Sequence, residues 1–141
     1  MNPRDVIGVL RVIACGASII ASGCSQVPRP LPCARLGGGA PMLEYHLYFG
    51  RASVTDPAWA EFTADVITPQ LPDGFTVLDA NGQWMNPKTH RIVGEPTSVL
   101  VVALPDSAAN DAAITAIKDA YRAQFHQQSV GTTVHAVCGA F

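Results

Sequence analysis

The sequence predicts an α+β fold, a ferredoxin-like βαββαβ plait in which a four-stranded antiparallel sheet carries both helices on one face. Three observations lead to this prediction. Some segments alternate between apolar and polar residues, others repeat apolar residues every three or four positions, and these segments follow the order strand, helix, strand, strand, helix, strand. Right-handed crossovers then place the last strand antiparallel beside the first.

The first strand is expected at residues 43–50, LEYHLYFG, because its residues alternate with a period of two. One face carries Leu43, Tyr45, Leu47 and Phe49. A helix is expected next, with Asp56 as its N-cap and Pro57 in its first turn. The helix should end at Thr68-Pro69, because proline disfavours the helical conformation of the residue before it.

The middle of the chain predicts a hairpin whose turn has two possible positions. Asn81-Gly82 suits a two-residue turn, but that register leaves the apolar run SVLVVAL outside the hairpin. A tip at Asn86 to Thr89 pairs Met85 with His90 and brings the two apolar runs together, so we prefer it. Asn81-Gly82 then becomes a bulge or a bend in a long hairpin, opposite Glu95-Pro96.

The second helix is expected after Pro105-Asp106, and SVGTTVHAVC (129–138) is the last strand. The apolar residues that recur along the helix are Ile114, Ile117, Tyr121 and Phe125. Because the last strand lies beside the first, its end at Cys138 should lie near Cys33. Cys33 and Cys138 are the two cysteines that follow the N-terminal export and lipidation segment described below, and such a pair in an oxidising compartment favours a disulfide. The cysteines and the topology therefore agree.

An exported, lipid-anchored protein is expected from the N-terminus. Residues 1–23 have basic residues and a short apolar run typical of a signal peptide, and Ala21-Ser22-Gly23 before Cys24 resembles a bacterial lipobox. Cys24 is then the lipidated residue, and residues 24–42 form a Pro/Gly-rich tether to a single domain at 43–141. The predicted location is the cell envelope or periplasm, where the lipid on Cys24 anchors the protein to a membrane.

Composition excludes several function classes. After Cys24 there are seven Lys and Arg against ten Asp and Glu, with no basic run, which argues against nucleic acid as a partner. No Gly-rich phosphate loop follows a strand and no G-x-S-x-G elbow occurs. No cofactor and no metal site is predicted.

Several separated blocks resemble one bacterial family, the domain of unknown function 3574. They are LYFG (47–50), LPDGFTVLDANGQW (71–84), RIVGEPTSVLVV (91–102) and AYRAQFHQQSV (120–130). The resemblance runs from about Leu43 to Phe141 and implies a short secreted protein or lipoprotein. It implies no activity and no catalytic residues.

Candidate site residues on the hairpin are two carboxylates and an aromatic ring. Asp79 and Glu95 come close to opposite each other in the preferred register, where facing carboxylates suit acid–base chemistry or a cation, unless a basic neighbour neutralises them. Trp84 near the tip either packs on the core or offers a ligand a stacking surface. Asp73 is expected to serve a turn.

The sheet face away from the helices provides the other candidates. His46, Tyr48 and His135 are predicted to lie there on adjacent strands, too few for a metal unless Glu44 joins them. Apolar residues are also expected on this face, which favours a homodimer or another partner covering it. They are Tyr48, Leu78, Leu100 and Val102.

The sequence therefore predicts an uncharacterised envelope lipoprotein whose small domain binds a partner or ligand. The alternative is an enzyme at a dimer interface on the outer sheet face, using His46, Tyr48 or His135.

Overall fold

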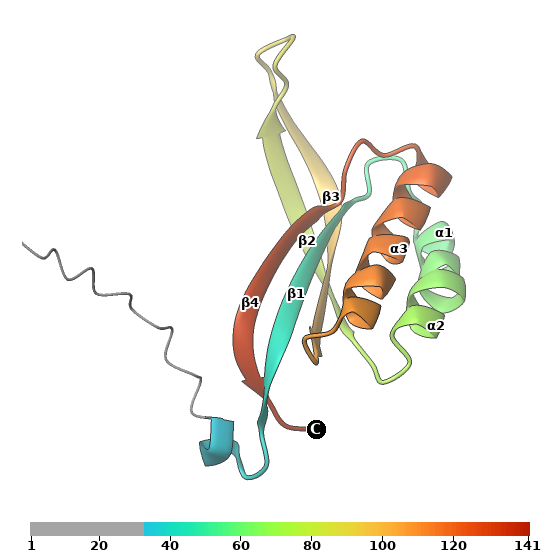
Figure 1. Ribbon diagram of the computed structural model, residues 1–141. Coiled ribbons are helices and arrows are strands. Elements are labelled where there is room, and N and C mark those ends of the chain that lie inside the picture. The colour runs from blue at the N-terminus through green and yellow to red at the C-terminus, as the bar shows by residue number, and fades with distance from the viewer. Residues whose placement is uncertain (1–32) are drawn as a thin grey trace, which may run out of the picture.

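The computed structural model describes residues 33–141 (Figure 1). The predicted signal peptide, Cys24 and the tether as far as residue 32 therefore lie outside the described residues. The elements in chain order are η1 (Cys33–Leu36), β1 (Ala40–Gly50), α1 (Asp56–Phe62), the π-helical segment η2 (Thr63–Ile67), α2 (Thr68–Gln70), β2 (Thr76–Met85), β3 (Ile92–Leu104), α3 (Ala108–Phe125) and β4 (Gly131–Gly139).

The four strands form one antiparallel sheet in the order β2-β3-β1-β4. Helices α1, α2 and α3 cover one face of this sheet (Figure 1). This is the predicted ferredoxin-like plait, with the last strand antiparallel beside the first. Within residues 33–141, no helix is long and apolar enough to cross a membrane.

The core lies between the sheet and the helices, and aromatic rings fill its centre. Tyr45, Leu47 and Phe49 of β1 point towards the helices and are at most 4% exposed. The rings of Phe49 and Tyr121 meet edge to face with centroids 4.8 Å apart. The period-two face predicted for the first strand is thus confirmed.

The first helix departs from its prediction at both ends. Its N-cap is Thr55 rather than Asp56, and the Thr55 hydroxyl accepts a hydrogen bond from the backbone N–H of Ala58. The chain also stays helical through Thr68 and Pro69 to the end of α2. The π-helical turn widens the backbone before Pro69, whose ring would otherwise meet the carbonyl of the preceding turn.

The hairpin register is two residues away from the preferred one. Met85 pairs with Ile92 rather than with His90, so the connecting loop is residues 86–91. Asn86 closes this longer loop, because its side-chain oxygen accepts hydrogen bonds from the backbone N–H groups of Lys88 and Thr89. His90, with φ of 53°, takes the left-handed conformation that completes the turn.

No bulge interrupts this hairpin. The pairing runs without a break from Thr76 opposite Val101 to Met85 opposite Ile92, and it includes Gly82 opposite Glu95. The predicted bulge at Asn81-Gly82 is therefore wrong. Proline is accommodated at the end of the β1–β3 pairing, where the Pro96 carbonyl accepts a hydrogen bond from the backbone N–H of Arg51. The N–H that proline lacks is not needed there, because the Arg51 carbonyl accepts from the backbone N–H of Val54.

The disulfide joins Cys33 to Cys138, with the two Cα atoms 5.1 Å apart, which confirms the predicted pair. In the register, Cys138 lies opposite Pro41 near the start of β1. The bond therefore fixes the entry of the chain to the end of β4. Among the described residues the first element, η1, precedes the expected domain start at Leu43.

We predict that replacing both cysteines, Cys33→Ser with Cys138→Ser, lowers the free energy of unfolding by about 2–4 kcal/mol, because the unfolded chain regains the freedom of a long closed loop. Urea unfolding of the oxidised protein and the variant measures this difference. The wild-type protein under reducing conditions serves as the control and should match the variant. Equal urea midpoints for the oxidised and reduced protein would contradict the prediction.

Two buried tyrosines connect strand β1 and helix α3 by hydrogen bonds. The Tyr45 hydroxyl donates a hydrogen bond of 2.6 Å to the Asp111 carboxylate, and Tyr121 donates one of 2.8 Å to the Gly50 carbonyl. Burial raises the pKa of Tyr45 from 10.0 to about 12, with a further contribution from Asp111. Burial also raises the pKa of Tyr121 to about 12.

Stability should therefore fall between pH 10 and pH 12. In this window the unfolded tyrosines ionise while the folded ones stay protonated, so the free energy of unfolding decreases as the pH rises. The double variant Tyr45→Phe with Tyr121→Phe should be less stable at pH 7, by about 1 kcal/mol for each lost hydrogen bond. Its urea midpoint should change less than that of the wild type across the alkaline window. Identical alkaline slopes in the two proteins would rule this explanation out.

Candidate functional site

At one end of the sheet the strands end at different positions, and a hollow lies there. The pairing of β1 with β3 ends at Gly50 opposite Thr97, whereas β3 already begins at Ile92 and β2 continues to Met85. The β2–β3 hairpin therefore extends past the end of β1, as Figure 1 shows. On the other side of β1, β4 begins at Gly131 opposite Tyr48, and the α3–β4 loop precedes it.

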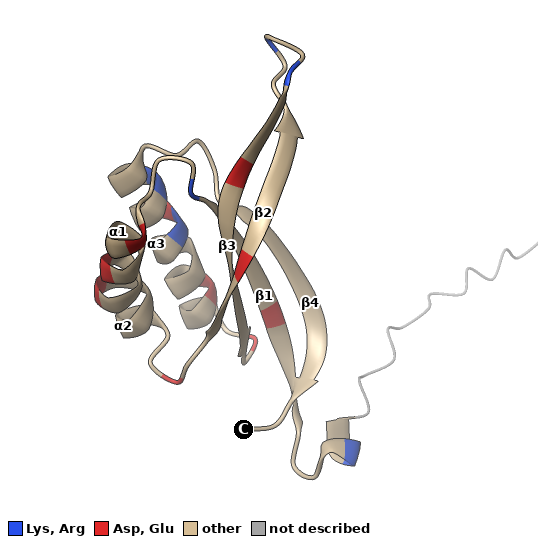
Figure 2. Ribbon diagram, turned by 180° about the vertical axis from the view of Figure 1, so that it is seen from behind, with Lys and Arg blue, Asp and Glu red and all other residues tan. Residues whose placement is uncertain are grey.

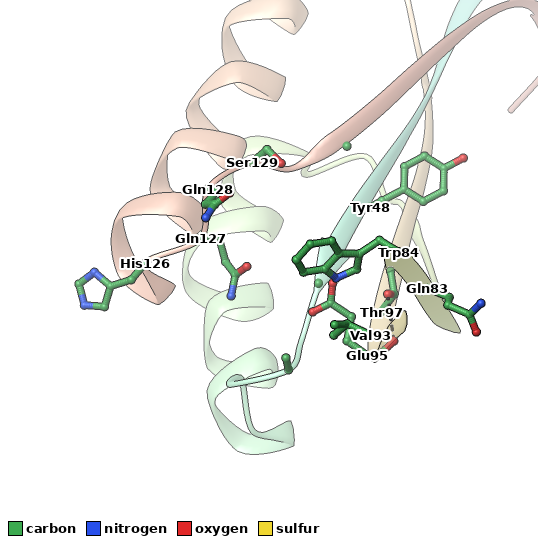
Figure 3. Close-up of a pocket in the computed structure, with 14 residues that line it drawn as sticks. Tyr48, Gln83, Trp84, Val93, Glu95, Thr97, His126, Gln127, Gln128 and Ser129 are labelled. Carbon is green, nitrogen blue, oxygen red and sulfur yellow. Dashed lines mark hydrogen bonds between the residues drawn. The ribbon is translucent and has the colours of Figure 1, made fainter. Parts of the chain in front are cut away.

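Between the hairpin and the α3–β4 loop lies a cavity of about 660 Å³, which we call the notch (Figure 3). Its volume suits a small-molecule ligand. The residues lining it are Tyr48, Gly50, Ala52, Gly82, Gln83, Trp84, Val93, Glu95, Thr97, His126, Gln127, Gln128, Ser129 and Gly131. Three residues predicted as site candidates, Tyr48, Trp84 and Glu95, thus meet in one cavity.

Glycines make the space that the Glu95 side chain occupies. A Cβ atom on Gly50 would lie 2.8 Å from the Glu95 Oε1 atom. On the neighbouring strand Gly82 pairs with Glu95, and a Cβ there would lie 2.8 Å from the Thr97 hydroxyl. The half-buried carboxylate therefore lies flat against the end of β1, a position that any larger residue at Gly50 would obstruct.

Trp84 and Tyr48 provide the aromatic surface of the notch. Trp84 lies opposite Val93, one diagonal step from Glu95 on the same face of the hairpin. Its side chain is 47% exposed and that of Tyr48 is 38% exposed, so both rings are accessible. Of the two alternatives for Trp84, core packing or a stacking surface, the structure shows no burial in the core: the ring is exposed and lies beside the Glu95 carboxylate (Figure 3).

Arg51 lies directly behind the notch but is engaged elsewhere. Its side chain is 10% exposed; it pairs with Asp56 and donates a hydrogen bond of 3.3 Å to the Ser98 hydroxyl. Its guanidinium also lies 5.6 Å from the centroid of the Trp59 ring.

None of the three ion pairs within residues 33–141 includes Glu95. The basic residues Lys88 and Arg91 belong to the loop at the hairpin tip (Figure 2) and do not line the notch.

Asp79 does not face Glu95, which corrects the predicted carboxylate pair. Asp79 pairs with Ser98, whereas Glu95 pairs with Gly82. Residues 95 and 98 are an odd number of positions apart on one strand, so Asp79 and Glu95 lie on opposite faces of the sheet. Asp79 is exposed and lies outside the notch, as does Asp73, which precedes Gly74 in a turn.

The two histidines come together on the outer sheet face, but away from the notch. His135 pairs with Glu44 across β1 and β4, and the ring centroids of His46 and His135 are 5.7 Å apart. A His46 ring nitrogen lies 2.9 Å from a Glu44 carboxylate oxygen. In the described part of the chain no group of three His, Cys, Asp or Glu side chains could hold a metal ion.

The apolar content of the outer sheet face differs from the prediction. Leu100 and Val102 were expected there, but they pair with Leu47 and Tyr45, point into the core, and are 0% and 4% exposed. Val99 and Val101 take the outward positions instead, because successive side chains of a strand alternate between faces. Tyr48 and Leu78 lie on the outer face as expected, and Leu78 is 52% exposed.

Sequence reasoning missed the second wall of the notch, the α3–β4 loop. It begins at His126, whose left-handed conformation (φ 55°) ends α3, and it continues through Gln127 and Gln128. The only signal was the end of the helical repeat at Phe125. A pattern of that kind locates a loop but not the cavity beside it.

Comparison with known proteins now places the chain in a family. Residues 44–141 match the family described as "Protein of unknown function (DUF3574)". The chain belongs to this family. The predicted resemblance is confirmed, and DUF3574 membership carries no activity with it. No curated protein matches the chain.

Two solved structures resemble the DUF3574 domain in fold. A phage SAM lyase in complex with S-methyl-5'-thioadenosine has 13% sequence identity and a TM-score of 0.51, with 70% of this chain and 90% of that chain covered. CPII, a nitrogen regulatory PII-like protein from Thiomonas intermedia K12 bound to ADP, AMP and bicarbonate, has 14% identity and a TM-score of 0.45, with 73% and 97% covered. At such identities the likeness concerns the fold alone.

Proposed function

We propose that this DUF3574 protein is a lipid-tethered binding domain of the bacterial cell envelope and that it binds a small ligand in the notch. The observation that carries the proposal is the convergence of Tyr48, Trp84 and Glu95, from three strands, on one cavity of about 660 Å³. Binding sites for small molecules combine a concave surface, aromatic walls and a few polar groups in this way.

The envelope location is supported by the sequence of the N-terminus and by the disulfide. The signal-like run and the Ala21-Ser22-Gly23-Cys24 segment favour lipidation at Cys24. A disulfide between Cys33 and Cys138 suits an oxidising compartment outside the cytoplasm. The tether would then leave the domain close to the membrane surface.

We predict that the purified protein begins at Cys24 and carries the mass of a lipid there, and that Cys24→Ala abolishes this modification. Intact mass spectrometry of both proteins from the membrane fraction measures it. Cys15→Ala is the matched control, because that residue lies in the part of the chain that should be removed, and its mature mass should be unchanged. A wild-type protein without added lipid mass would refute the anchor while leaving the notch proposal intact.

Ligand binding should depend on Trp84. We predict that the wild-type protein, purified from its envelope under mild conditions, retains a small molecule in native mass spectrometry and that Trp84→Ala loses it. Met85→Ala is the matched control, because Met85 is an exposed apolar neighbour on the same strand but does not line the notch. Retention of the same molecule by Trp84→Ala, or its loss from Met85→Ala as well, would contradict a site in the notch.

The enzyme alternative has less support from this arrangement. Of His46, Tyr48 and His135, only Tyr48 lines the notch. A homodimer through the outer sheet face stays a prediction. The exposed Leu78 beside half-buried Val99 and Val101 favours it, and the native mass of the intact protein tests it.

A further inference from the structure

We infer that the notch selects ligands that carry an ammonium or guanidinium group, and that Glu95 and Trp84 together recognise this group. The inference rests on the proposed function, because it names the chemical class of ligand for the same site. It is carried by three features of the notch: the sign of its charge, the lack of a partner for that charge, and the aromatic surface beside it.

The first feature is the sign of the charge. Glu95 is the one carboxylate among the residues lining the notch, and no lysine or arginine lines it. His126, on the exposed end of α3, is the only basic side chain of the set. An anionic ligand would lie against Glu95 without a lysine or arginine to offset the repulsion, whereas a cationic ligand would be attracted.

The second feature is that Glu95 has no partner of its own in the described part of the chain. Its carboxylate appears in none of the side-chain hydrogen bonds or ion pairs there. The buried guanidinium of Arg51, which follows Gly50 of the notch, already binds Asp56 and Ser98. Its oxygens are open to solvent, since Arg51 Nε is the one buried side-chain nitrogen or oxygen without a partner within residues 33–141. A ligand ammonium can therefore reach the Glu95 carboxylate and form charge-assisted hydrogen bonds with it.

The third feature is the aromatic surface. Trp84 lies diagonally across the hairpin from Glu95 on the same face, and Tyr48 lies on the neighbouring strand β1. A cation within about 6 Å of an indole ring is attracted by its π face, most strongly where water is partly excluded. One cationic group can therefore meet the carboxylate and the indole face together. A neutral ligand would gain only the stacking.

A series of small aromatic ligands of similar size and different charge tests the inference. The probes are benzylammonium, neutral benzamide and anionic benzoate, added at pH 7 to the intact mature protein in neutral detergent micelles. Binding is followed by NMR at the indole N–H signal of Trp84, while the buried Trp59 provides an internal reference. We expect benzylammonium to bind about tenfold more tightly than benzamide, and benzoate to leave the signal unchanged.

Two substitutions separate the charge of Glu95 from its position. Glu95→Gln keeps the shape and removes the charge, and Gly50→Ala keeps the charge but pushes the carboxylate aside, since the new Cβ would lie 2.8 Å from it. Both should lose the about tenfold preference for benzylammonium over benzamide. Gly94→Ala is the control, because a Cβ there has no neighbour closer than 3.8 Å.

The outcomes distinguish this inference from the proposed function. If benzamide and benzylammonium shift the Trp84 signal equally, or if Glu95→Gln leaves the preference unchanged, the notch binds ligands without selecting cations and the inference is overturned. If none of the probes shifts the Trp84 signal, the inference is also overturned. The proposed function is judged separately, by whether native mass spectrometry finds a retained molecule that depends on Trp84.

Discussion

The antiparallel pairing of β1 with β3, and its end at Gly50, is the constraint on which the rest of the structure depends. β1 is the inner strand that pairs with β3 on one side and β4 on the other. Because this pairing stops opposite Thr97 while the hairpin continues, the sheet is wide at one end and has a step at the other. The same strand therefore organises the core along its length and creates the notch at its end.

Core and site use alternate residues of the same strand. Leu47 and Phe49 point inwards and are fully buried, and Tyr48 between them points into the notch. Tyr121 links the two sides, because its hydroxyl bonds to the Gly50 carbonyl at the floor of the step. The electrostatics are linked as well: burial has the largest effect and raises the pKa of Tyr121, Arg51 lowers that pKa, and Glu95 raises it further. The position of the carboxylate is thus fixed by well-packed elements rather than by a free loop.

Much of this arrangement could be predicted from the sequence, and the part that could not has a physical reason. Alternation and helical repeats depend on neighbouring residues, so the order of elements, the inner face of β1 and the disulfide were predictable. The hairpin register was not, because it depends on how Asn86 closes a longer loop through its own side chain. A shift of two residues keeps every side chain on its face, so the core survived the error.

The candidate site was more sensitive than the core to such errors. Trp84 and Glu95 were recognised as candidates from their residue types. The residues that lie beside them could not be predicted, because these depend on the hairpin register. Residues 99–104 of β3 are all apolar, so the pattern does not show which face Leu100 occupies. The role of Gly50 was equally hidden, since its missing side chain matters only once Glu95 lies against it.

The unpaired carboxylate is the strongest sign that the notch is more than a defect in packing. A guanidinium at Arg51 follows Gly50 directly, yet it points to the other side and bonds Asp56 and Ser98. Gly50 leaves the space that the Glu95 side chain occupies, and Gly82 leaves space for the Thr97 hydroxyl beside it, although glycine weakens a strand. A domain selected for stability alone would gain from a larger residue at these positions or from a partner for the carboxylate. Residues that weaken the local structure in this way are expected at functional sites.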